Sequence, residues 1–273
     1  MVPDESLRCI ADEIKNAQDS GRQIEPITSR VSAFDMRSAY HVSELIHGMR
    51  LGEGYIPVGR KIGFTNPEMW KIYGVCEPIW AYVYDRTVIH VRGPSVSCGI
   101  SRFTEPKIEP EIVLHFSSTS PPAGGVDEIP GSIDWIAHGI EIVQSHFPGW
   151  RFNAADTVAD WGLHGMLIVG EPLKIKCLGT ELVRKLEDFS IVLARDGLIQ
   201  EWGLGSNALG GPVQAAVHLL SVLDRQDKSM RLQAGELVTT GTLTPARSIR
   251  PGETWKTELR GIPLPGLTVT FEE

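Results

Sequence analysis

Short apolar runs separated by glycine and proline fill most of the chain after Gly54, and this pattern constrains the fold more than any other feature. The runs are PVGRKIGF, TVIHV, EIVLHF, IEIVQS, GMLIVG and FSIVLARDGLIQEW. Runs of this length bounded by turn residues are typical of β-strands, and Asp196-Gly197 in the last run is typical of a two-residue hairpin turn. We therefore expect a body built mostly of strands.

Helical periodicity appears before this body and at two places inside it. Before it, two apolar stripes recur at helical spacing: Leu7, Ile10, Ala11, Ile14 and Ala17 up to Gly21, then Ala39, Val42, Leu45, Ile46 and Met49 up to Gly52. Inside it, helices are expected near DTVADWGL and in GGPVQAAVHLLSVL, where Pro212 suits a first turn. The prediction is an α+β fold with a helical N-terminal region at 1–58 and a mixed-β domain at 59–273.

The segment from Ser117 to Ser132 is rich in Ser, Pro and Gly. It is predicted to be a loop within the strand-rich part, in the position of a flap.

Charge and hydropathy exclude several classes of protein. The chain has 273 residues and a net charge of -8, and no basic stripe is interleaved with aromatic residues, which argues against nucleic-acid binding. No apolar run approaches the roughly 20 residues of a membrane span, and the N-terminal MVPDESLRC has no apolar signal core. We therefore expect a cytoplasmic protein whose partners are small molecules or proteins.

The spacing of the cysteines argues against a zinc knuckle and against a thioredoxin-type redox motif. Cys9, Cys76, Cys98 and Cys177 lie far apart and form no CxxC pair. Reduced, structural thiols are expected.

Two glutamates stand directly before an apolar run in EPKIEPEIVLHF. Glu109 and Glu111 are two residues apart, so on a strand their side chains point the same way. Glu141, in AHGIEIVQS, is a third carboxylate in the next strand-like run. Three carboxylates suit Mg²⁺ or Mn²⁺ better than zinc. Spacing alone leaves a second reading open, in which solvated strand-edge glutamates pair with Lys107 or with arginines.

The chain resembles the 2-hydroxypenta-2,4-dienoate (2-keto-4-pentenoate) hydratases and 4-oxalocrotonate decarboxylases of the fumarylacetoacetate hydrolase superfamily. The resemblance rests on segments in the family's order: GRKIGFTNPEMWKIYGVCEP, EPKIEPEI, IEIVQSHF, DTVADWGLHG, LGSNALGGPVQAAVHLL and LQAGELVTTGTLTPARSIRPGE. It implies a mixed β-roll core with a small helical N-terminal part and a homo-oligomer, with an enzyme of the same pathway as a further candidate partner. It also implies a Mg²⁺ or Mn²⁺ ion held by Glu109, Glu111 and Glu141, and it places the family's K-I-G lysine at Lys61.

The implied activity is that of a lyase that hydrates an unsaturated 2-oxo acid, or 2-hydroxydienoate, in aromatic-compound catabolism. A 2-oxo acid can chelate the metal, which stabilises the enolate formed when C3 loses a proton. Lys61 is the candidate acid/base, with a pKa lowered towards neutrality beside the cation; an ordinary solvated lysine is the alternative.

Three other functions stay open: a decarboxylase of a 2-oxo diacid, a C–C hydrolase of an acylpyruvate, and a non-catalytic 2-oxo-acid-binding scaffold. The hydrolase would need a His/Glu pair that is not evident.

Two aspartates are further catalytic candidates. Asp85 follows the lysine motif at a distance where relatives carry an acidic residue, and it would orient Lys61 or a water; an ion pair with Arg86 or a turn cap is the alternative. Asp160, in the family's Ala-Asp pair, would position the site without binding the metal; capping or turn formation is the alternative.

Four residues are candidates for contact with the substrate. Arg60 would meet a substrate carboxylate unless it is a surface residue, and Trp161 would line the distal pocket unless it fills the core. Ser206 would lie in a polar loop near the pocket, and the small tract Thr240-Gly241-Thr242 would let the backbone approach the ligand. Gly203-Leu204-Gly205 is not a dinucleotide fingerprint, so no nicotinamide cofactor is predicted.

The chain departs from its relatives at two places. Trp161, Gly162, Leu163 and His164 stand where relatives have Asn followed by small or hydroxylated residues, and Leu209-Gly210-Gly211-Pro212 replaces Leu-Gly-His-Pro or Leu-Gly-Asn-Pro. The metal carboxylates and the lysine are retained. We therefore expect the same chemistry on a substrate other than the simplest pentadienoate.

Overall fold

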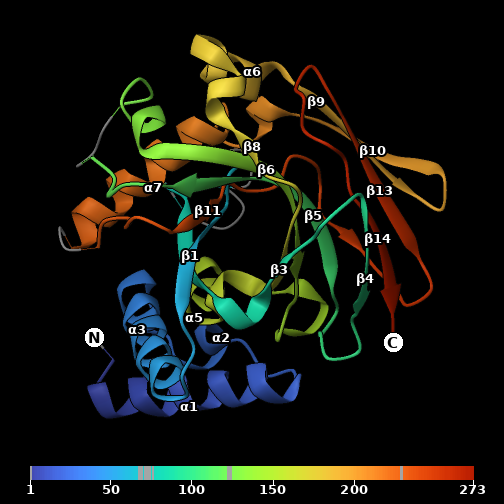
Figure 1. Ribbon diagram of the computed structural model, residues 1–273. Coiled ribbons are helices and arrows are strands. Elements are labelled where there is room, and N and C mark those ends of the chain that lie inside the picture. The colour runs from blue at the N-terminus through green and yellow to red at the C-terminus, as the bar shows by residue number, and fades with distance from the viewer. Residues whose placement is uncertain (1, 67–69, 71–74, 76, 122–124, 228–229) are drawn as a thin grey trace.

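The computed structural model describes residues 2–66, 70, 75, 77–121, 125–227 and 230–273 (Figure 1). Within them, the larger sheet has the order β2-β1-β11-β5-β6-β7-β3, with β12 paired to β5 and β8 to β6. Its strands are β1 Pro57–Gly63, β2 Ile79–Tyr84, β3 Val88–His90, β5 Lys107–Phe116, β6 Ile133–Val143, β7 His164–Val169, β8 Leu173–Lys174, β11 Leu237–Thr239 and β12 Arg247–Ser248. The α+β class is confirmed.

A second sheet forms the right side of the molecule in Figure 1 and has the order β10-β9-β13-β14-β4. Its strands are β4 Ser95–Gly99, β9 Ser190–Arg195, β10 Leu198–Leu204, β13 Thr254–Arg260 and β14 Thr268–Glu272. The predicted hairpin turn joins β9 to β10, and both Asp196 and Gly197 have positive φ, at 50° and 81°.

The helices are α1 Asp4–Ser20, α2 Ile27–Arg30, α3 Met36–Gly52, α5 Ala154–Ala159, α6 Leu182–Asp188 and α7 Pro212–Gln226. Short 3₁₀ turns lie in the connections between these elements: η1 Asp85–Thr87, η2 Ile129–Ser132, η3 Pro148–Trp150, η4 Trp161–Leu163, η5 Ile175–Cys177, η6 Gly179–Glu181 and η7 Gly205–Asn207. None of the helices in the described part of the chain is both long and apolar enough to cross a membrane.

The N-terminal helices form where the apolar stripes predict them. Helix α1 buries the five residues of the first stripe and ends at Gly21 in the left-handed conformation, with φ 61°. Helix α3 begins after Asp35, whose Oδ1 accepts a hydrogen bond from the Ser38 N–H at 2.8 Å. Both helices pack in one apolar cluster with Ile79 and with residues of α5. The helical region therefore covers the end of the large sheet near β1, while its boundary at residue 58 stays a prediction (Figure 1).

Strands β5 and β6 are central to the large sheet and separate two environments. Ile108, Ile112 and Leu114 of β5 point to one face, where they join apolar clusters that include α7 and the second sheet. Glu109 and Glu111 alternate with them and therefore point to the other face. The fold thus places both acidic side chains opposite the main core.

Periodicity gave no separate prediction for β2, β4, β8, β11, β12, β13, β14, α2 or α6. The predicted loop at 117–132 is packed at both ends, because Ser120 and Ile129 are buried, and residues 122–124 lie outside the described part. Cys9, Cys98 and Cys177 are free thiols, and Cys76 lies outside the described residues.

Candidate metal centre and active site

Three glutamates from two neighbouring strands converge on one point. Glu109 lies directly opposite Glu141 in the pairing of β5 with β6, and Glu111 is two residues further along β5. One carboxylate oxygen of each lies within 4.8 Å of the others. Glu111 and Glu141 are 1% and 0% exposed, and Glu109 is partly exposed. The alternative of solvated strand-edge glutamates is therefore wrong for Glu111 and Glu141.

The electrostatics of this cluster fit a divalent cation. Burial raises the pKa of Glu109 to about 7, despite the opposing charge of Lys61. Burial, together with the charges of the other two glutamates, raises the pKa of Glu111 well above its ordinary value. Glu111 Oε1 is buried and has no hydrogen-bond partner within the described part of the chain. Buried carboxylates with a free oxygen are the donors that Mg²⁺ or Mn²⁺ prefers.

The other oxygen of Glu111 is held by the strand that follows α7. Thr239 donates its hydroxyl hydrogen to Oε2, and the Gly241 N–H donates to the same atom at 2.9 Å. Gly241 has φ 95°, and a Cβ there would lie 2.2 Å from the Thr65 side chain. The backbone of this tract therefore lies close to Glu111 and Thr65, and its expected approach to a ligand stays a prediction. Thr242 donates from Oγ1 to the Thr244 carbonyl at 2.7 Å.

Glu141 is held from both sides. Its Oε2 lies 2.9 Å from Lys61 Nζ, and its Oε1 lies 2.7 Å from His164 Nδ1. Burial acts to raise the pKa of Glu141, but Lys61 and the hydrogen bond from His164 lower it overall. Of the three glutamates, Glu141 is therefore the one whose ionised form the surrounding residues favour most.

Lys61 is buried beside the three glutamates, with an exposed fraction of 3%. The alternative of a solvated lysine is therefore wrong. Burial alone would lower its pKa, but the surrounding carboxylates raise the pKa above its ordinary value. The protein's own residues therefore do not lower the pKa of Lys61, and the lowered pKa expected beside a cation stays a prediction.

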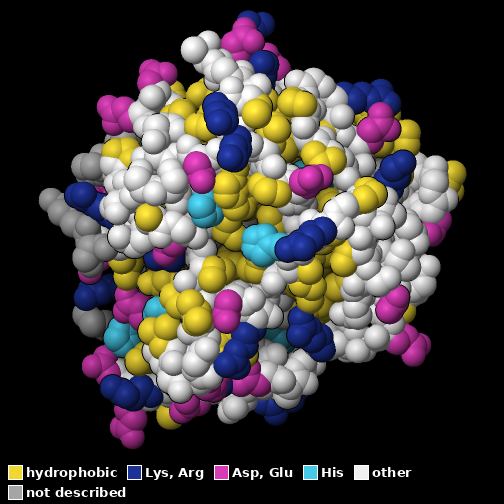
Figure 2. Space-filling model, viewed as in Figure 1, with side chains coloured by type: hydrophobic (Ala, Val, Ile, Leu, Met, Phe, Trp, Pro, Cys, Tyr) yellow, Lys and Arg dark blue, Asp and Glu magenta, His cyan; other side chains and the backbone are white. Residues whose placement is uncertain are grey.

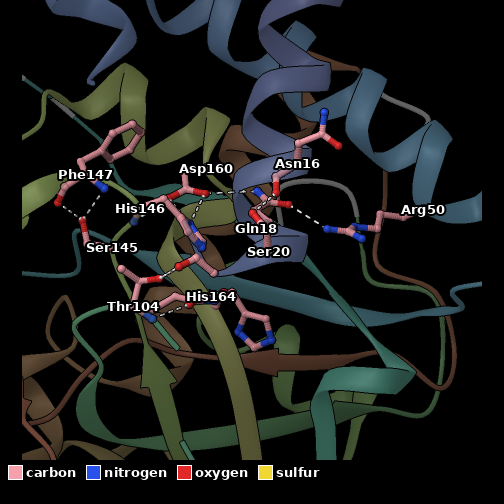
Figure 3. A network of polar contacts seen from close by, with 12 residues as sticks. Asn16, Gln18, Ser20, Arg50, Thr104, Ser145, His146, Phe147, Asp160 and His164 are labelled. Carbon is pink, nitrogen blue, oxygen red and sulfur yellow. Dashed lines mark hydrogen bonds and ion pairs between the residues drawn. The ribbon is translucent and has the colours of Figure 1, made fainter. Parts of the chain in front are cut away.

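Asp160 belongs to a buried polar network that Figure 3 shows between α1, α3 and the end of β6. Its carboxylate lies 2.9 Å from His146 Nδ1 and accepts from Gln18 Nε2 at 3.2 Å, and Gln18 in turn accepts from Arg50 at 3.0 Å. Burial opposes the charged form of His146, yet the Asp160 carboxylate raises its pKa overall. Asp160 thus ties the N-terminal helices to His146, in the segment that follows the strand carrying Glu141.

Trp161 is the first residue of η4, the turn that covers Lys61. Its indole is half-buried, donates from Nε1 to the Tyr82 carbonyl at 2.6 Å and packs edge-on against His164. A Cβ on the next residue, Gly162, would lie 3.3 Å from Lys61 Cδ, so the backbone there rests on the lysine stem. Contact between Trp161 and a substrate stays a prediction.

Arg60 is not brought to the cluster. Successive side chains on a strand point to opposite faces, so Arg60 points away from the side that Lys61 occupies. It is 5% exposed, lies 2.8 Å from Glu236 Oε1 and stacks on Tyr82. The expected contact with a substrate carboxylate is therefore not supported, and the alternative of a surface arginine is also wrong.

Asp85 and Ser206 are both exposed. Asp85 Oδ1 accepts a hydrogen bond from the Ile56 N–H at 2.9 Å, 29 residues earlier in the chain, so this contact joins two segments and is neither the expected turn cap nor an ion pair with Arg86. Ser206 lies in η7, where its carbonyl accepts from the Gly210 N–H. The described contacts do not place either side chain against the glutamates.

Sequence reasoning missed the roles of several residues that hold the cluster. Thr239 and the Gly241 N–H bind Glu111, and His164 binds Glu141. His164 was evident only as a departure from the relatives. Its side-chain direction depends on an irregularity in strand pairing that no periodic pattern reveals.

Along most of its length the chain is similar in sequence to known enzymes. No family model matches the chain. The 2-keto-4-pentenoate hydratase of Burkholderia vietnamiensis is 29% identical over 276 residues, covering 100% of both chains. A 4-oxalocrotonate decarboxylase of Pseudomonas putida is 24% identical, covering 94% of both chains.

Solved structures show the same fold. The 4-oxalocrotonate decarboxylase of Pseudomonas putida G7, complexed with magnesium and adipate, superposes with a TM-score of 0.90 at 23% identity, covering 99% of both chains. A fumarylpyruvate hydrolase of Pseudomonas aeruginosa superposes with a TM-score of 0.57 at 15% identity, covering 78% of this chain and 88% of that one. The chain is thus a homologue of the 2-keto-4-pentenoate hydratases and has the fold of fumarylacetoacetate hydrolase family proteins.

Proposed function

We propose that this protein is a Mg²⁺- or Mn²⁺-dependent lyase that adds water to an unsaturated 2-oxo acid or its 2-hydroxydienoate tautomer. The observation that carries the proposal is the convergence of Glu109, Glu111 and Glu141 beside the buried Lys61. Homology to hydratases along the whole chain supports the same reaction.

The protein's own residues supply the binding site and the proton transfer. Glu109, Glu111 and Glu141 would hold the cation, which when bound supplies Lewis-acid stabilisation for charge that develops on a 2-oxo oxygen. Lys61 would exchange a proton with the substrate carbon next to that group, since it is the buried acid/base beside the cluster. Burial of Lys61 and Glu141 keeps water from this side of the site.

Decarboxylation of a 2-oxo diacid is the second candidate function. It needs the same stabilisation of an enolate and is the activity of the homologous 4-oxalocrotonate decarboxylase. The two reactions separate by product, because only decarboxylation releases carbon dioxide.

The test is a substrate panel. Purified protein with Mg²⁺ is incubated with 2-hydroxydienoates of different length and with 2-oxo diacids, and ultraviolet absorbance and carbon dioxide are followed together. We expect loss of dienol absorbance without carbon dioxide. Turnover of the diacids alone, with release of carbon dioxide, would show that the protein is a decarboxylase instead. If no compound is turned over, the remaining interpretation is a non-catalytic protein that binds 2-oxo acids.

We also propose that the protein is a homo-oligomer. Large hydrophobic side chains are exposed along the edge strand β10, with Leu198 at 69% and Trp202 at 57%. Figure 2 shows further hydrophobic side chains gathered across the middle of one face. Exposed patches of this kind commonly mark contact surfaces. Light scattering should give a mass that is a multiple of the 30.0 kDa chain; a single-chain mass at micromolar concentration would contradict the proposal.

A further inference from the structure

His164 reaches Glu141 only because the pairing of β6 with β7 is irregular. Glu141 pairs with Leu167 and Ile142 with Met166, but Val143 then pairs with His164, so Gly165 is an extra residue in β7. Without this bulge, His164 would fall on the face opposite Glu141. A bulge re-aims the side chains that precede or follow it. Here it brings His164 to the same face as Glu141.

Only glycine fits at the bulge. A Cβ on Gly165 would lie 2.7 Å from the carbonyl oxygen of Ile142 and 3.2 Å from the ring of Phe103. The glycine therefore allows the two strands to approach closely at the point where the imidazole turns towards the glutamate. The close approach of the strands at Gly165 therefore accompanies the contact between His164 and Glu141.

Both ring nitrogens of His164 have partners. Nδ1 lies 2.7 Å from Glu141 Oε1, and Nε2 lies 2.8 Å from Thr87 Oγ1. The ring is fully buried and packs against the Trp161 indole, with centroids 5.3 Å apart. The imidazole is therefore fixed at two nitrogens and one ring edge, and it cannot swing away from Glu141 without leaving a buried polar atom unpaired.

We infer that His164 is a positioning residue for the metal centre. By occupying Oε1, it leaves Oε2 as the oxygen of Glu141 that faces the cluster and Lys61, so that Glu141 offers the cation one oxygen in a fixed direction. The inference rests on the proposed metal-dependent function. Residues that orient metal ligands in this way typically change metal affinity or activity 10–100-fold when they are replaced.

Two substitutions of similar polarity separate this role from simple packing. The side-chain nitrogen of Asn lies as many bonds from Cα as Nδ1, and that of Gln as many as Nε2. His164→Asn should keep a donor for Glu141, whereas His164→Gln should keep only the contact to Thr87. Calorimetric titration with Mg²⁺ should give an affinity within about threefold of wild type for the Asn variant and about 10–100-fold weaker for the Gln variant.

The matched control is His138→Asn. His138 is another buried histidine with both nitrogens bonded, and it points to the opposite face of the sheet. Its Nδ1 contacts the backbone carbonyl of Glu111 and its Nε2 contacts Thr257 Oγ1, so Asn keeps a donor for that carbonyl and loses only the contact with Thr257. This variant should lower the melting temperature without changing Mg²⁺ affinity.

Equal Mg²⁺ affinity in His164→Gln and wild type would overturn the inference, as would equal losses in His164→Gln and His138→Asn. If wild type itself bound no Mg²⁺, the proposed function would fail instead. If His164→Gln does not fold, Thr87→Val is measured in its place. An unchanged Mg²⁺ affinity in Thr87→Val would contradict the inference that contacts at both ring nitrogens fix the imidazole, and a weaker affinity would support it.

Discussion

Three glutamates share a site that is largely closed to water, and their mutual repulsion requires positive charge nearby. Lys61 supplies one such charge beside Glu141. Glu109 and Glu111 keep raised pKa values in spite of it, because burial disfavours their ionised forms. This combination of burial and unbalanced negative charge supports the proposal that the three carboxylates hold a cation.

Replacing Glu111 by Gln should weaken Mg²⁺ binding about 10-fold or more while the metal-free fold persists. The amide keeps the shape and still accepts from Thr239 and Gly241, but it lacks the charge that a cation needs. Glu109→Gln should act in the same direction, and Glu258→Gln, on the exposed surface, serves as the control. Unchanged Mg²⁺ binding in both site variants, measured by calorimetry, would remove the metal assignment.

Lys61→Ala should reduce turnover by about 10²–10⁴-fold, the usual range for loss of a general acid/base. Metal affinity should be retained, since the substitution removes a positive charge from beside the carboxylates. Exchange of the C3 protons of a 2-oxo acid in deuterated water, followed by NMR, reports the proton transfer directly. Exchange at the wild-type rate would assign that transfer to another group.

At the scale of elements, alternation along the strands predicts much of the arrangement. The i, i+2 spacing of Glu109 and Glu111 places them on one face, and the apolar residues between and after them indicate a buried strand, as the structure shows. The same alternation separates Arg60 from Lys61, a consequence that the sequence interpretation of Arg60 overlooked. The glutamate cluster was thus within reach of pattern reasoning.

Long-range and irregular features were not predictable from local patterns. The binding of Glu111 by Thr239 joins residues 128 positions apart, and the direction of His164 depends on the Gly165 bulge. For Asp85 a contact was expected that the structure does not show. The expectation rested on its distance along the chain from Lys61, and this does not specify a distance in space. Its carboxylate instead binds the backbone at Ile56.

Gly165→Ala should test the bulge as an element. The added Cβ would clash with the Ile142 carbonyl, so the strand pairing must shift, at a cost of about 1–3 kcal/mol for overpacking. A lower melting temperature and weaker Mg²⁺ binding are expected together, because the shift moves His164. Gly131→Ala, where a Cβ would meet no atom within 4 Å, is the matched control. A wild-type melting temperature in Gly165→Ala would show that the bulge tolerates a side chain.

At the scale of the whole molecule, metal binding should couple to pH. Carboxyl groups with raised pKa values hold protons that a cation must displace, so protons compete with the metal as the pH falls through about 7, the pKa of Glu109. The stabilisation that Mg²⁺ confers should therefore be larger at pH 8 than at pH 6.

The measurement is the difference in melting temperature with and without Mg²⁺ at each pH. Histidines such as His47 and His138, whose pKa values burial lowers to about 4, affect both scans equally and cancel in the difference. A Mg²⁺-induced shift that is equal at the two pH values, or larger at pH 6, would contradict the competition.

The most direct test of the account is removal and return of the metal during turnover of a 2-hydroxydienoate. Protein treated with a chelator and then freed of it should lose the decay of dienol absorbance and regain it when Mg²⁺ or Mn²⁺ is added. Glu111→Gln should not regain it at the same metal concentration. Full turnover by the metal-free wild-type protein, or equal recovery by Glu111→Gln, would contradict the claim that these carboxylates hold the cation on which the reaction depends.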